Sequence, residues 1–181
     1  FNQVFFDNAI AKKEDLVSEL NQGWTVGKRL LQHERSGLES LASGGVAAED
    51  HDLTRLAKEY LGDEDGLIAD PVWRNRVLCY QMNSEVFRLA QRRAVQESTD
   101  GATPGPVTSI FKVYGSELSQ EYDALAVELR GYRGFGNDAT FSETELAVTR
   151  HWLYNRASSI YSGSNEVQRN IIAKRVLGLP D

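Results

Sequence analysis

SIYSGSNEVQRN, residues 159–170, joins two helix-like segments through a break at Gly163. Polar residues crowd the break, and apolar residues lie on both sides of it. A helix that begins after Gly163 has backbone N–H groups without intrahelical partners and a partial positive charge at its start. Such a start can bind a phosphate or a carbonyl oxygen. The same pattern is also typical of an ordinary corner in a helical bundle, and the residues alone leave both interpretations open.

The composition indicates a folded protein with mixed surface charge. The chain has 181 residues, of which 41% are hydrophobic, enough for a core and too many for a disordered chain. The net charge of −6 argues against a protein that binds nucleic acid electrostatically. Cys79 is the only cysteine, so no internal disulfide and no cysteine-based metal site can form.

No membrane span or signal peptide is predicted. No apolar run approaches the roughly 20 residues that span a bilayer, and the N-terminus lacks the layout of a signal peptide. The chain opens on Phe1-Asn2-Gln3-Val4-Phe5 without an initiating Met, and Met82 is its only methionine. We therefore expect a fragment or a processed piece of a longer protein.

The first forty residues predict a strand and then a helix. Gln3–Asp7 reads as a short β-strand, which must complete a sheet mostly outside this sequence because one strand cannot stand alone. Asn21 suits the N-cap of a helix over Trp24 to about Leu41. The buried face predicted for this helix carries residues at helical spacing, namely Trp24, Gly27, Leu30, Leu31 and Leu38.

Five further segments show helical periodicity. They are predicted at His51–Leu61, Pro71 to about Gln96, Val107–Tyr132, Ser142–Tyr161 and about Asn165–Val176. Long helices with short to medium connections form antiparallel bundles. The predicted fold class is all-α, an antiparallel four-helix bundle preceded by a short β-strand remnant. The predicted domain boundary separates residues 1–20 from the bundle over 21–181.

Few residues outside the corner suggest chemistry. Glu34 lies one turn after Leu30 and one turn before Leu38, where desolvation would raise the pKa of a carboxylate and suit it to act as a general base. The alternative is a surface carboxylate paired with Arg35. The acidic loop Gly62–Gly66 lacks the ligand spacing of an EF-hand, and the three histidines share no ligand spacing, so no metal site is predicted.

The C-terminal residues resemble the end of an acyl-CoA dehydrogenase. Residues 160–180, IYSGSNEVQRNIIAKRVLGLP, are similar to that family's terminal Ile-Tyr-x-Gly-Thr-x-Glu-Ile-Gln-Arg-x-Ile-Ile-Ala segment. Asn21–Arg35 resembles the start of its C-terminal helical domain, and Phe5–Asp7 with Leu16-Val17 resembles the end of its middle β-domain. Ser109–Lys112 with Ser116-Glu117 resembles the third bundle helix of many bacterial members. The resemblance covers nearly the whole chain.

This resemblance implies an FAD-dependent oxidoreductase of fatty acid or sterol side-chain β-oxidation. Members oxidise acyl-CoA thioesters to trans-2-enoyl-CoA: a glutamate removes the α-proton, and the β-hydrogen leaves as hydride to the flavin. In many members this base stands between the Tyr and the Gly of the terminal motif, where this chain has Ser162. Other members place it just before an Arg on the first helix of the domain, and Glu34 matches that position.

The resemblance also implies binding roles and partners. Cofactor-binding positions correspond to Ser164, Asn165, Glu166 and Val167, and substrate-binding positions to Arg35, Tyr161 and Gly163. It further implies electron transfer to an electron-transfer flavoprotein. The expected assembly is a homo- or hetero-tetramer built as a dimer of dimers, in the bacterial cytoplasm.

Two segments depart from the family pattern. Leu67–Pro71 stands in place of an Arg-x-x-Phe-Gly segment, and Gly131–Gly136 in place of Gln-x-x-Gly-Gly, both of which help the family to hold a FAD of the neighbouring subunit. Gly131–Gly136 follows a helix, which favours a flexible connection over a phosphate-binding loop. The departures leave a second interpretation, a non-catalytic partner or assembly subunit of a hetero-oligomeric acyl-CoA dehydrogenase. Acyl-CoA oxidase chemistry is a third.

Overall fold

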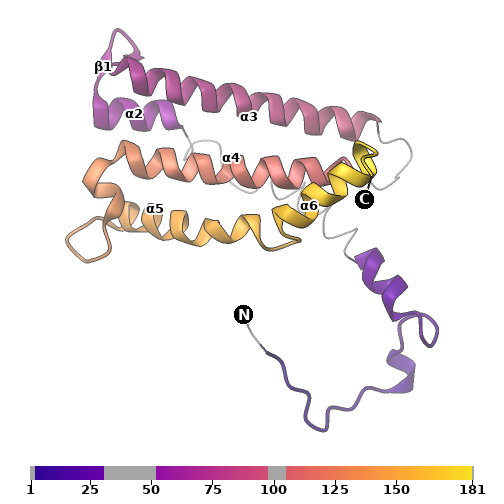
Figure 1. Ribbon diagram of the computed structural model, residues 1–181. Helices are drawn as coiled ribbons and strands as arrows, with labels where there is room; N and C mark the ends of the chain where they lie inside the picture. The colour runs from indigo at the N-terminus through magenta and orange to yellow at the C-terminus, as the bar shows by residue number, and fades with distance from the viewer. Residues whose placement is uncertain (1–2, 31–51, 98–104, 181) are drawn as a thin grey trace. The chain divides into compact units, whose positions relative to one another are not determined.

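The structure, a computed structural model, describes residues 3–30, 52–97 and 105–180. It divides into two compact units, Phe1–Ser43 and Gly44–Asp181. Figure 1 shows the helices of both units. The domain boundary predicted between residues 20 and 21 stays a prediction.

The described part of the first unit is largely irregular. A 3₁₀ helix, η1, spans Lys13–Asp15, and residues 23–30 are helical. The strand predicted at Gln3–Asp7 is wrong: residues 3–6 adopt no regular structure, since no neighbouring strand completes their hydrogen bonds in the described part of the chain. Trp24, predicted to be buried, is 74% exposed. The rest of the helix predicted to extend to Leu41 lies outside the described residues.

The second unit is a bundle arranged around a long central helix. Its α-helices are α2 (Leu53–Leu61), α3 (Pro71–Glu97), α4 (Thr108–Leu129), α5 (Glu143–Tyr154) and α6 (Asn165–Ile171). Helix α4 contacts each of the other four, with α2 and α3 on one side and α5 and α6 on the other (Figure 1). This arrangement confirms the predicted all-α helical bundle.

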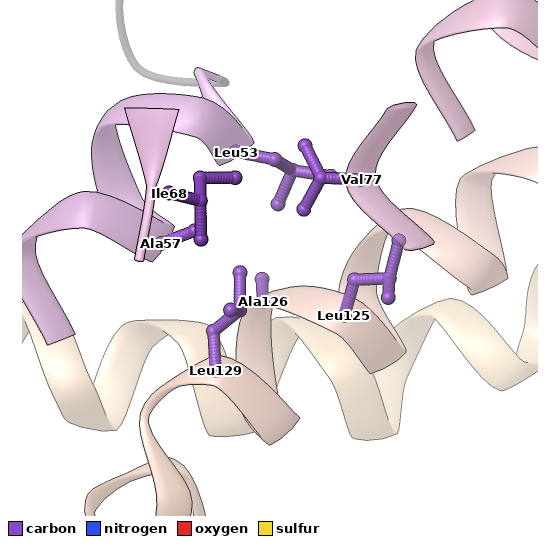
Figure 2. Packing of buried hydrophobic residues seen from close by; sticks show 7 residues of the cluster. All are labelled: Leu53, Ala57, Ile68, Val77, Leu125, Ala126 and Leu129. Carbon is purple, nitrogen blue, oxygen red and sulfur yellow. The ribbon is translucent and has the colours of Figure 1, made fainter. Parts of the chain in front are cut away.

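The core of the bundle lies between α4 and the layer formed by α2 and α3. Figure 2 shows its apolar side chains converging from α2, α3, α4 and the strand that follows α2, namely Leu53, Ala57, Ile68, Val77, Leu125, Ala126 and Leu129. Full burial of one such leucine stabilises the fold by roughly 1.5–3 kcal/mol. Helical spacing places the members from α2, α3 and α4 on one face of each helix, whereas Ile68 comes from a strand and has no such signal.

The acidic loop predicted at Gly62–Gly66 is part of a small β-hairpin. Strand β1 (Asp63–Glu64) pairs antiparallel with β2 (Leu67–Ile68). Asp65 and Gly66 connect them with left-handed φ angles of 50° and 80°. An Asp-Gly pair between two short strands is a strong signal for such a turn, and helical periodicity alone does not detect it.

Three of the predicted helices change character near their C-terminal ends. Helix α4 ends before Tyr132 and is followed by a 3₁₀ helix, η2 (Gly131–Phe135). Helix α5 ends before Tyr161 and continues as the 3₁₀ helix η3 (Asn155–Ser159). Helix α6 continues as a π-helical turn, η4 (Ile172–Val176). A single 3₁₀ or π-helical turn is too short for the spacing of apolar residues to distinguish it from a turn of α-helix.

Candidate functional site

The corner between η3 and α6 is a tight turn with two consecutive left-handed residues. Ser162 has φ 56° and Gly163 has φ 92°. A Cβ added at Gly163 would overlap Nε2 of Gln168, whose side chain is only 1% exposed. Glycine is therefore required at position 163 by both the backbone angle and the close packing. We refer to residues 161–164 as the corner turn.

On the α6 side, the corner turn ends at a buried asparagine that points into the bundle. Asn165 is 5% exposed. Its Oδ1 accepts a hydrogen bond from Lys112 Nζ at 2.7 Å, and its Nδ2 donates to Ser116 Oγ at 3.0 Å. Both partners belong to α4, so this helix fixes the first residue of α6.

On the η3 side, a second group of polar contacts joins the same helix. Gln120 Nε2 donates to the backbone carbonyl of Asn155 at 3.2 Å and to Ser158 Oγ at 3.1 Å. The Asn155 side chain donates to Ser119 Oγ at 2.8 Å and to the carboxylate of Asp123, which is 4% exposed. Helix α4 therefore holds the chain both before and after the corner turn.

Charged side chains of both signs lie beside the corner turn, at the start of α6 and on α4. The backbone N–H of Glu166 and the Ser164 hydroxyl hydrogen-bond the Glu166 carboxylate and lower its pKa, with smaller contributions from Arg169 and Lys112. Desolvation lowers the pKa of Lys112, and the nearby Glu166 charge opposes that change. Arg169 in turn pairs with Glu117 of α4 at 2.5 Å. Because the start of α6 already holds its own carboxylate, the structure does not favour the binding of a further anion there.

The predicted site residues differ in how the structure presents them. Tyr161 and Val167 are about half exposed, at 48% and 52%. Asn165 is turned toward α4, so its side chain supports the turn rather than lining its outer surface. Glu34 and Arg35 lie outside the described residues.

Sequence reasoning missed the part played by α4. Lys112 and Ser116 belong to the segment that resembles a family helix, and that resemblance gives them no role in the site. The signal was present in their spacing: Lys112, Ser116 and Gln120 recur every fourth residue, and so form a polar row along one face of a helix whose opposite face is apolar.

The described residues offer neither a metal-binding cluster nor a membrane span. Among residues 3–30, 52–97 and 105–180, no group of three or more His, Cys, Asp and Glu side chains could hold a metal ion. No helix within these ranges is long and apolar enough to cross a membrane.

A family model described as "Acyl-CoA dehydrogenase, C-terminal domain" matches residues 21–177. The chain belongs to the acyl-CoA dehydrogenase family. The match includes the helix predicted from Trp24, the bundle and the corner turn. Acyl-CoA dehydrogenases are flavoproteins that use FAD.

Similar proteins include both sequence relatives and solved structures. An acyl-CoA dehydrogenase IpdE1 of Mycolicibacterium smegmatis is 34% identical over 99% of this chain and 43% of its own length. A human very long-chain specific acyl-CoA dehydrogenase of mitochondria is 25% identical over 94% of this chain and 25% of its own length. The chain therefore spans less than half the length of these curated relatives.

The structural neighbours agree with the sequence relatives. The ChsE4–ChsE5 complex from Mycobacterium tuberculosis contains a chain with a TM-score of 0.65 and 26% identity, covering 90% of this chain and 42% of that one. A solved structure described as a steroid ACAD (acyl-CoA dehydrogenase) variant has a TM-score of 0.69 at 22% identity and covers 90% of this chain and 42% of that one. This likeness supports the fold alone.

Proposed function

We propose that the full-length protein is an FAD-dependent dehydrogenase that converts an acyl-CoA thioester to trans-2-enoyl-CoA, with Glu34 as the base. Membership of the acyl-CoA dehydrogenase family supports the reaction class. The observation that carries the choice of base is Ser162, because a hydroxyl occupies the position where many members have the catalytic carboxylate. Glu34, followed by Arg35, matches the other position that the family uses.

The chemistry of the corner turn fits a flavin. The turn and the start of α6 combine half-exposed apolar surface from Tyr161 and Val167 with the Ser164 hydroxyl group. Such a surface can contact both an aromatic ring and its polar edge. We assign Ser164, Asn165, Glu166 and Val167 to FAD binding, with Asn165 acting through its position in the turn. FAD, when bound, supplies the acceptor for the hydride that leaves the β-carbon.

The remaining residues act on the thioester. We assign Tyr161 and Gly163 to binding the substrate beside its thioester, and Arg35 to binding the CoA end of the substrate. The Glu34 carboxylate takes the α-proton; the C–H electrons form the new double bond as the β-hydrogen departs with its own electron pair. A carboxylate serves better than the Ser162 hydroxyl because a general base needs a pKa near the operating pH.

The test of Glu34 is a conservative substitution in the full-length enzyme. We expect E34Q to retain bound FAD and its yellow absorbance, while reduction of the flavin by acyl-CoA slows by about 10²–10⁴-fold in single-turnover stopped-flow measurements. E39Q, a change of the same kind on the same predicted helix, is the matched control and should react like wild type. Reduction of E34Q at the wild-type rate would show that another group is the base.

Substrate class, electron acceptor and assembly belong to the same proposal. Fatty acyl and sterol side-chain CoA thioesters are the two substrate classes to compare in this assay. An electron-transfer flavoprotein is the proposed acceptor, and a homo- or hetero-tetramer the proposed assembly. Oxygen consumption in place of acceptor reduction would instead indicate an acyl-CoA oxidase.

A second candidate function, a non-catalytic partner subunit, is favoured by the structure of η2. Gly134 in η2 is buried, and a Cβ there would overlap the backbone carbonyl of Val127 in α4. The segment predicted to be a flexible connection is thus a 3₁₀ turn packed against the bundle, and its sequence differs from the Gln-x-x-Gly-Gly segment of the family. A colourless, inactive full-length protein after purification alone would support this second function. A yellow protein that acyl-CoA bleaches would support the first.

A further inference from the structure

One face of α4 carries polar side chains that contact the chain on both sides of the corner turn. Lys112 and Ser116 bind Asn165 after the turn, and Gln120 binds Asn155 and Ser158 before it. Hydrophobic packing requires none of these groups, and burial of each one costs free energy unless it is hydrogen-bonded. A buried and connected set of polar groups specifies one arrangement of the elements it joins.

We propose that Lys112 is a positioning residue, which holds Asn165 together with Ser116 and thereby fixes the conformation of residues 161–164. The anchoring of the turn depends only on the contacts within this chain. Its consequence for FAD rests on the function proposed above.

Hydrogen-bond capacity makes Lys112 the decisive member of the group. Ser116 has a single hydroxyl proton and two acceptors within reach, the backbone carbonyl of Val113 at 2.9 Å and Asn165 Oδ1 at 3.2 Å. The shorter contact assigns the proton to Val113. The Ser116 oxygen is then free to accept from Asn165 Nδ2, while the Asn165 Oδ1 takes its donor from Lys112. Loss of the ammonium group would leave that buried oxygen without its charged donor, and charge-assisted hydrogen bonds are stronger than neutral ones.

The conformation of the turn explains why an anchor is needed. Ser162 and Gly163 both have left-handed φ angles, and for a serine this region is unfavourable. Such residues persist where the surrounding structure holds them in place. Asn165 begins α6 directly after the turn, so its release would let residues 161–164 relax to other conformations.

Hydrogen–deuterium exchange in the full-length protein tests the anchor directly. We expect K112M, which keeps most of the alkyl stem, to raise the exchange rate of amides 160–168 by about tenfold or more, because local opening becomes easier. K58M is the matched control: Lys58 is also partly buried, and its ion pair with Asp63 at 3.1 Å lies at the hairpin next to α2. K58M should leave amides 160–168 unchanged, and equal exchange in K112M and K58M would overturn the proposal.

Two further variants keep the test decisive if K112M fails to fold. S116A removes the acceptor for Asn165 Nδ2, and we expect it to raise exchange of the same amides. K112R restores a charged donor on an apolar stem and should return the exchange rate part of the way toward wild type. Unchanged exchange in S116A, or K112R exchanging at least as fast as K112M, would count against a positioning role.

Flavin binding distinguishes this proposal from the proposed function. If both hold, K112M weakens FAD binding by about tenfold and alters the visible circular dichroism of the bound flavin, whereas K58M does neither. A wild-type protein that binds no FAD would refute the flavin function, and the exchange experiment would still decide the anchor. Faster exchange in K112M with unchanged FAD affinity and flavin spectrum would refute the link between the anchor and the cofactor.

Discussion

The two faces of α4 contact their neighbours by opposite means. Toward α2 and α3, the helix presents apolar side chains such as Leu125 and Leu129, which belong to the same buried cluster as Leu53 and Val77 (Figure 2). Toward η3 and α6, it presents polar side chains that bind Asn155 and Asn165. Both faces are buried, but apolar packing joins one of them to its neighbours and directional hydrogen bonds join the other.

The two kinds of contact have different consequences for the stability of the bundle and for the position of the corner turn. Apolar contacts are non-directional and contribute in proportion to the area they bury. Hydrogen bonds between buried polar groups contribute less on balance, but they are satisfied in one geometry and costly when broken. We infer that the apolar face supplies most of the stability of the bundle, and that the polar face sets the position of the corner turn.

The largest expected effect is on the apolar face. L125A should lower the free energy of unfolding by about 2–5 kcal/mol, because it removes buried methyl groups and leaves a cavity. L67A, on the half-exposed side of the hairpin, should cost far less. Chemical denaturation of the full-length protein measures both. A similar cost for the two variants would contradict the view that this face carries the stability.

The next prediction breaks the polar face at Asp123. N155L removes an amide donor to this buried carboxylate, and it should lower the free energy of unfolding by about 1–3 kcal/mol. The double variant D123L/N155L replaces both partners by apolar groups and should be less destabilised than the sum of the two single variants. Additive costs in this double-mutant cycle would show that the two groups do not act as a pair.

A third prediction compares two glycines with left-handed φ. A Cβ added at position 163 would overlap the Gln168 side chain, whereas a Cβ added at position 178 would have nothing within 4 Å. G178A should cost only the backbone strain, about 1–2 kcal/mol, and G163A should cost more. Thermal unfolding of both full-length variants measures the difference. Equal losses would mean that the turn yields to the extra methyl group.

The smallest expected effect appears only at alkaline pH. Tyr80 of α3 lies against Tyr122 of α4, and desolvation raises its pKa from 10.0 to about 12, while the Ser84 hydroxyl opposes the rise. The folded state therefore holds this proton more tightly than the unfolded state. The associated stability is fully present below pH 10 and is lost as the pH rises through about 12.

Y80F is the variant that isolates this alkaline loss. It removes the ionisable group, so its unfolding free energy should fall less steeply than that of wild type between pH 10 and 12. At lower pH the two proteins should give parallel profiles in chemical denaturation. Equal slopes above pH 10 would assign the alkaline loss to other groups.

The helices of the bundle were predictable because each has a continuous apolar face. Pro71 and the Asp70 side chain mark the start of α3 from local chemistry alone, and the structure places the start of that helix there. The strand at Gln3–Asp7 failed because a strand depends on a partner, and the described part of this chain contains none for it. The hairpin at Asp65 and Gly66 was missed because a helical period does not register a two-residue turn.

The candidate site was predictable only in part, for a related reason. The positions of Gly163 and Ser162 follow from the local sequence, and the structure shows the left-handed angles that a break there suggests. The contact of Lys112 with Asn165 joins residues that are 53 positions apart in the sequence. A local sequence pattern does not predict a contact between positions so far apart. Glu34 stays a prediction, since it lies outside the described residues.

The sequence by itself determined the helical bundle, the break at Gly163 and the resemblance that the family comparison confirmed. These depend on the order of apolar, polar and glycine residues within a few turns of the chain. Only the tertiary structure decided that Asn165 points inward, that η2 packs against α4, and that one helix contacts the chain on both sides of the corner turn. Those features depend on which groups meet across the bundle: η2 packs where Gly134 leaves room for the backbone of α4, and a hydrogen bond requires both partners to be in place.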